Sequence, residues 1–263
     1  MKSKLTYLAS ALALGLFAST NASATVVGGI DFGNMGQTHI ETATFANTWV
    51  SPGSDAGTTV TGYGMVTTLN GATNYCASGS CTLYFTYTAD LALPTTATSQ
   101  IFLTNSVYTF YLADTSAINF MNQSSDANWA YINSLTAWAQ FTGTDLGGGI
   151  DYTMTPSTYD GTTFNGTGTG LADVNLAFGL ADVAAYLNGN SASFGADIEI
   201  TSSTNSFVLN PNDVCTFQNG DWCLQGTVNT RGRVNTSVPE PAGLALFALG
   251  ALGLGLSRRR QTA

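Results

Sequence analysis

Residues 82–88 read Thr82-Leu83-Tyr84-Phe85-Thr86-Tyr87-Thr88, and this stretch decides the fold class. Its β-branched, aromatic and aliphatic side chains favour an extended strand. A second stretch of the same kind, Val107-Tyr108-Thr109-Phe110-Tyr111-Leu112, lies further along the chain. Neither stretch has helical periodicity, so both predict strands of a β protein.

Three more segments alternate apolar and polar positions and are predicted strands: residues 44–50, 60–69 and 196–200. In the last of these, the alternation places Asp197 and Glu199 outward. Turn sequences separate the segments at residues 51–53, 70–71, 160–161 and 188–189. The glycine-rich run 166–170 is also interpreted as a turn. Only residues 129–138 have helical spacing, and a strand beginning near Ala137 competes there. Together these signals predict an all-β fold, an antiparallel β-sandwich, with a jelly-roll-like order left open.

The N-terminus has the pattern of a signal peptide. Met1-Lys2-Ser3-Lys4 is basic, residues 5–17 are mostly apolar, and Ala22-Ser23-Ala24 offers the small-x-small pattern that a signal peptidase accepts. We place the cleavage after Ala24, which makes residues 1–24 a removed signal helix. An uncleaved anchor is the alternative, but the apolar stretch is short for a membrane span.

The C-terminus carries a second membrane signal. Val238-Pro239-Glu240-Pro241 precedes the uncharged apolar run 242–256, and Arg258, Arg259 and Arg260 follow. As a helix, that run would extend about 22 Å, short of a hydrocarbon core of roughly 30 Å. Arginines beside an apolar run hold that end in the cytoplasm, so the chain would export its middle and anchor its tail transiently in the inner membrane.

This C-terminal segment resembles a PEP-CTERM sorting domain in its Pro-Glu-Pro motif, apolar helix and basic terminus. The resemblance implies recognition by an exosortase in a Gram-negative envelope, removal of the tail near Pro239, and delivery to the cell surface or an exopolysaccharide matrix. An anchor that is never cleaved is the alternative. We therefore divide the chain into residues 1–24, a mature domain at 25–237 and a sorting segment at 238–263.

The mature domain is strongly acidic. Only Arg231 and Arg233 of the seven basic residues lie within it, against fifteen of the sixteen acidic residues. A chain so poor in cations cannot replace phosphate counterions, which excludes nucleic acid as a partner. The same argument excludes anionic membranes as partners. Its aromatic and aliphatic content favours a folded domain over disorder.

Four cysteines remain after processing. Cys76 and Cys81 are close in sequence, as are Cys215 and Cys223. Export to an oxidising compartment predicts two local disulfides, Cys76–Cys81 and Cys215–Cys223. Zinc is the alternative, but neither pair has C-x2-C spacing or a nearby histidine.

Three patterns bear on chemistry. His39 is the only histidine, and no G-x-S-x-G motif supplies a nucleophile for it. Asp197 and Glu199 could form the carboxylate pair of a glycoside hydrolase, or lie on a solvated face. Calcium is the other metal that we consider, and its candidate ligands lie in glycine-rich sequence: Asp145, Asp151, Asp160 and Asp173.

The stretch 61–70, running into Cys76 and Cys81, is similar to a segment of PEP-CTERM proteins associated with flocculation or the matrix. Residues 170–174 and 195–198 are similar to segments of the same proteins. This resemblance implies an envelope role and no active site. We therefore expect a non-enzymatic protein of the biofilm matrix, with exosortase, signal peptidase and extracellular polysaccharide as partners. A carbohydrate-binding module and a secreted hydrolase are the alternatives.

Overall fold

The protein is described by a computed structural model that covers residues 25–33, 37–42, 47–50, 55–94, 100–113, 125–159, 164–206 and 222–235. The remaining residues include the signal peptide and the sorting segment. The described elements, in chain order, are β1 (Val26–Val27), β2 (Ile30–Asp31), β3 (Gln37–Thr42), β4 (Asn47–Val50), β5 (Thr59–Leu69), β6 (Thr82–Leu91), β7 (Ile101–Ala113), α2 (Ser125–Ser134), β8 (Ala137–Gly143), β9 (Tyr152–Tyr159), β10 (Phe164–Gly179), α3 (Ala181–Leu187), the 3-10 turn η1 (Ser193–Gly195), β11 (Ile198–Ser206) and β12 (Trp222–Arg233).

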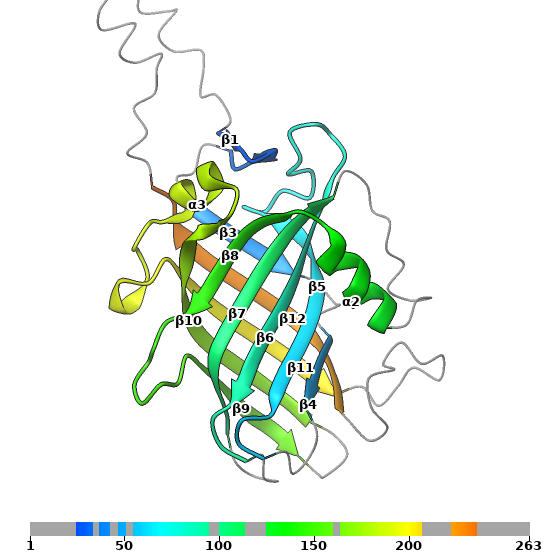
Figure 1. The fold of residues 1–263 in the computed structure, drawn as a ribbon, viewed down its shortest axis with the longest axis vertical. Helices are drawn as coiled ribbons and strands as arrows, with labels where there is room; N and C mark the ends of the chain where they lie inside the picture. The colour runs from blue at the N-terminus through cyan, green and yellow to red at the C-terminus, as the bar shows by residue number, and fades with distance from the viewer. Residues whose placement is uncertain are drawn as a thin grey trace, which may run out of the picture.

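Ten of these strands form one antiparallel sheet that closes on itself. The order β10-β8-β7-β6-β5-β3-β12 returns to β10 through β11, which pairs with both β10 and β12. β4 takes the place of β3 between β5 and β12 at one end, and β9 takes the place of β8 between β7 and β10. Figure 1 shows the result, with β5 to β8 as one wall and β10 to β12 behind them.

The prediction of an all-β, antiparallel fold is confirmed. The two walls face each other across a shared core, as the layers of a sandwich do, and hydrogen bonds join them at both edges, through β8 and β10 at one and through β3 at the other. Within the described strands, most neighbours in sequence pair in space, as β5 to β8 and β9 to β12 do, so the strand order is largely a meander. The predicted strands at 60–69, 82–88 and 107–112 lie within β5, β6 and β7.

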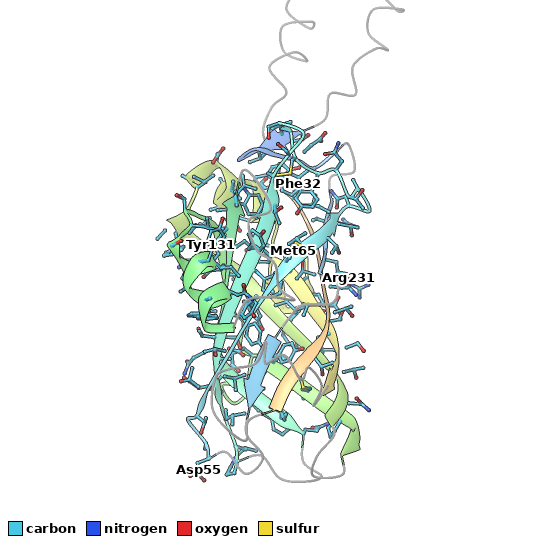
Figure 2. All side chains as sticks on the ribbon, turned by 90° about the vertical axis from the view of Figure 1, so that its right-hand side faces the viewer. Phe32, Asp55, Met65, Tyr131 and Arg231 are labelled. Atoms are coloured by element: carbon cyan, nitrogen blue, oxygen red, sulfur yellow. A yellow bond between two sulfur atoms is a disulfide. The ribbon has the colours of Figure 1, made fainter. Side chains whose placement is uncertain are left out.

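Residues 129–138 contain both structures that their sequence suggested. α2 ends at Ser134, and β8 begins at Ala137. The helix covers the outer face of β5 to β7, where Ile132 packs with Tyr63, Tyr84 and Tyr111. Figure 2 shows Tyr131 on this helix, which lies against the sheet beside the strand that carries Met65. This wall therefore has a second, smaller core on its outer side.

The glycine-rich run 166–170 is not a turn, and that interpretation was wrong. It lies within β10, where Gly166, Gly168 and Gly170 alternate as buried residues with exposed Thr167 and Thr169. A Cβ added to Gly168 would lie 2.0 Å from the hydroxyl of Tyr152, which faces it from β9. The glycines thus leave room inside the closed sheet for a large ring.

Candidate functional site

The described chain begins and ends at the same end of the closed sheet. The backbone N–H of Asn235, the last described residue, donates to the carbonyl of Tyr186 on α3 at 2.8 Å. Thr25, the first, exchanges backbone hydrogen bonds with Phe32 and Gly33 across the β1–β2 hairpin. Figure 1 shows this hairpin, α3 and the C-terminal end of β12 together at one end of the closed sheet. We call it the terminal end.

The hairpin is fixed on the terminal end by aromatic packing. Its turn is Gly28-Gly29, with φ of 56° and 82°, the left-handed conformation that a two-residue hairpin requires. Trp138 donates its indole N–H to the carbonyl of Gly28 at 2.9 Å. Phe32 stacks on Trp138 and contacts Tyr186, with ring centroids 6.2 and 4.9 Å apart. Both processing sites predicted from the sequence, after Ala24 and near Pro239, are therefore only a few residues from one rigid surface.

The processing residues themselves lie outside the described residues: Ala22, Ala24, Pro239, Glu240, Pro241, Arg258, Arg259 and Arg260. The structure therefore does not test the predicted roles of these residues in signal cleavage and sorting. No helix in the described part of the chain is long and apolar enough to cross a membrane.

The Cys76–Cys81 disulfide is formed, with its Cα atoms 5.6 Å apart, as predicted. It closes the loop between β5 and β6, and Cys76 also bridges to Ile30 in the hairpin of the terminal end. Cys223 lies on β12, but Cys215 is outside the described residues, so the second pairing stays a prediction.

Three of the four predicted calcium ligands are described, and they do not form a metal site together. Asp145 accepts the backbone N–H groups of Gly147 and Gly149 at 2.7 and 2.9 Å, which folds its own loop. Asp173 accepts the Thr144 hydroxyl at 2.7 Å. Asp160 lies outside the described residues. Among the residues whose positions are described, no group of three His, Cys, Asp or Glu side chains could hold a metal ion.

Asp151 is the fourth of these residues, and it is buried. Its carboxylate accepts the backbone N–H of Ser106 at 2.8 Å and the Ser106 hydroxyl at 2.5 Å. Ser106 follows Asn105, whose φ of 55° marks the irregularity where β7 shifts its register against β6. Burial raises the pKa of Asp151, and the bonds from Ser106 oppose that rise. The carboxylate thus stabilises a bulge from within the core.

Three tyrosines gather around this part of the core. Tyr87 and Tyr108 stack with centroids 6.1 Å apart, and Tyr152 shares a 2.5 Å hydrogen bond with Ser202. Burial raises the pKa of Tyr152 to about 12, and the hydrogen bond from Ser202 opposes the rise. Burial also raises the pKa of Tyr87 and Tyr108 well above the ordinary value. Neutral phenols at physiological pH therefore fill this space.

The expectation that Asp197 points outward was wrong. Asp197 is 2 % exposed, and it accepts the backbone N–H groups of Val174 and Asn190, each at 2.8 Å. Glu199 does lie outward, and it pairs with Arg231 at 2.9 Å. The two carboxylates that could have formed a hydrolytic pair are thus engaged by different partners on different sides of the sheet.

His39 lies on β3, opposite Arg231 of β12. An aromatic platform for sugar binding would need exposed Trp or Tyr on a sheet face. Among the residues whose side-chain burial is described, which include neither Trp49 nor Trp222, the exposed large apolar side chains contain no Trp or Tyr: Val26, Leu93, Leu176, Phe178, Leu180 and Phe194.

Sequence reasoning missed the last part of the terminal end. Leu176, Phe178 and Leu180 are 58, 42 and 37 % exposed, where β10 ends and α3 begins. Leu180 is the N-cap of α3 and approaches Gly28 of the hairpin. The apolar letters of this segment look like those of a core strand, so the sequence offered no signal of their exposure.

Residues 237–260 match the PEP-CTERM protein-sorting motif. The chain carries a PEP-CTERM sorting signal. This match confirms the resemblance drawn from the Pro-Glu-Pro motif, the apolar run and the arginines. The motif implies an exosortase as processing partner, together with export to the cell surface or the extracellular space. No curated protein and no solved structure matches the chain.

Proposed function

We propose that this PEP-CTERM protein is a non-enzymatic component of the exopolysaccharide or biofilm matrix of a Gram-negative bacterium. A signal peptidase would release its N-terminus, and an exosortase would remove its tail from the inner membrane. The sorting motif at residues 237–260 carries the proposal, because it directs the domain to the surface or beyond.

The non-enzymatic part of the proposal is supported by how the candidate carboxylates are used. A general acid or base needs a carboxylate that is free to exchange a proton with a substrate. Asp151 and Asp197 instead accept two hydrogen bonds each from fixed protein groups. Glu199 is paired with Arg231 across neighbouring strands. These side chains stabilise the sheet, which favours a durable scaffold over a catalyst.

The matrix role is tested by deleting the gene and measuring matrix retention of cells and polysaccharide. We expect the deletion to weaken the matrix, and Glu199→Gln and His39→Ala to restore it as fully as the wild-type protein does. Cell fractionation should find the protein in the matrix when the exosortase is present. Without the exosortase, the protein should be found in the inner membrane. If the Glu199→Gln or His39→Ala variant is secreted and folded but does not restore the matrix, the replaced side chain has a chemical role and the scaffold proposal is wrong.

A further inference from the structure

We infer that the terminal end is a lipid-contact surface, on which Leu176, Phe178 and Leu180 rest against the outer leaflet of the inner membrane before the tail is cut. The inference rests on the export route proposed above and not on the matrix role. It concerns the folded domain, whereas the sorting motif concerns the tail.

The first argument is the length of chain between the fold and the membrane. The hydrogen bond to Tyr186 fixes Asn235 on α3, and the apolar run begins at Ala242. Seven residue steps span at most about 25 Å when fully extended. The tether thus holds the terminal end near the lipid surface. The opposite end of the closed sheet, at Asp55 in Figure 2, is further away by roughly 30 Å, from the length and tilt of such strands.

The second argument is the nature of the side chains at this end. Val26 of the hairpin is 52 % exposed, and its strand β1 lies beside α3 at the same end as the three residues at the end of β10. A cluster of exposed apolar side chains on an exported domain marks an interaction site. Leucine and phenylalanine are residues that stabilise shallow insertion at a bilayer interface.

The third argument is the distribution of charge. The domain has fifteen acidic residues, and an anionic surface would repel it as a whole. Its two arginines, Arg231 and Arg233, both lie on the last residues of β12, beside the exit of the tail. Arg233 is exposed, and its backbone N–H is held by the Ser191 hydroxyl at 2.7 Å. Arg231 is paired with Glu199, so Arg233 is the cation that this end of the domain offers to phosphate headgroups.

Fluorescence quenching by lipid tests the inference in the full chain. The variant with residues 239–241 changed to alanine would be reconstituted through its tail into phosphatidylcholine vesicles, with plain or brominated acyl chains. Phe178→Trp places a reporter in the patch. Leu93→Trp places one at an equally exposed position at the opposite end, since Leu93 follows β6 on the side of Asp55.

We expect brominated lipid to remove on the order of half of the emission added by Trp at 178, and none of that added at 93. Adding Leu176→Ser and Leu180→Ser to the 178 reporter should at least halve the quenching, although the tether is unchanged. Equal quenching at both positions, or no quenching at 178, would overturn the inference. Self-association of the patch would also overturn it, and would appear as quenching lost while the 178 reporter stays blue-shifted in a larger species.

Discussion

Gly168 of β10 should not accept even one added methyl group without a change in core packing. A Cβ there would lie 2.0 Å from the Tyr152 hydroxyl oxygen and 2.5 Å from the ring carbon that carries it. Tyr152 cannot move freely, because it is 6 % exposed and bonded to Ser202. Gly168→Ala must therefore displace the ring and break that bond.

The expected cost follows from these two effects. Overpacking of a core costs about 1–3 kcal/mol, and a lost buried hydrogen bond about 1 kcal/mol more. We therefore expect Gly168→Ala to lower the free energy of unfolding by roughly 2–4 kcal/mol, or Tm by about 10 °C for a domain of this size. Urea and thermal unfolding of the purified exported protein, followed by circular dichroism, measure both quantities.

Two variants serve as controls. Thr169→Ala, on the exposed face of the same strand, should change the free energy of unfolding by less than about 0.5 kcal/mol. Tyr152→Leu removes the atoms that the new methyl group would strike. Its combination with Gly168→Ala should therefore be more stable than additivity predicts, by about 1–3 kcal/mol. Additive effects, or a Gly168→Ala variant as stable as the wild type, would refute the packing argument.

Three other predictions concern the disulfide, the buried phenol and the tail. Replacing Cys76 and Cys81 with serine should cost about 2 kcal/mol in the chain-entropy model, because the bond closes only a short loop; reductant should destabilise the wild type by at least as much, because it also reduces the predicted Cys215–Cys223 pair. The pKa of Tyr152 is raised, so its neutral form stabilises the fold below pH 10, and this contribution is lost as pH rises through about 12. Absorbance titration at 295 nm should show a late phase that Tyr152→Phe reduces but does not abolish, because burial also raises the pKa of Tyr87 and Tyr108; a single phase near pH 10 would contradict it. Changing residues 239–241 to alanine should retain the protein in the inner membrane, whereas intact mass of the exported wild type should end near Ser237 or Val238; a secreted form that keeps its arginines would contradict the assigned processing.

The strands could be predicted because their signal is local. Residues 82–88 lack helical spacing of apolar residues and contain no Gly, Pro, Asn or Asp that would favour a turn. They lie within β6, as predicted. The sorting signal was also recoverable, since the Pro-Glu-Pro motif, the apolar run and the arginines are adjacent in sequence. Closure of the sheet could not be predicted. It depends on the pairing of β11 with β12, and no local pattern shows which strand meets which.

The errors arose where a residue's environment is set by a distant partner. Asp197 was placed outward by extending the alternation of β11, but that strand begins only at Ile198. Its carboxylate turns inward because Val174, on another strand, presents an N–H to it. Gly168 was assigned to a turn because glycine favours turns. Only the position of Tyr152 explains why a strand needs glycine there.

The use of aspartate in this domain explains how so acidic a chain can fold with two basic residues. A buried carboxylate needs either a cation or several hydrogen-bond donors. Asp151 and Asp197 are satisfied by hydroxyl and backbone N–H donors, and Asp145 organises its loop in the same way. Each lies where the chain departs from regular pairing or turns. A carboxylate used in this way stabilises irregular backbone without a lysine or arginine. It also leaves Arg233, the last residue of β12, for the terminal end, where we place the membrane.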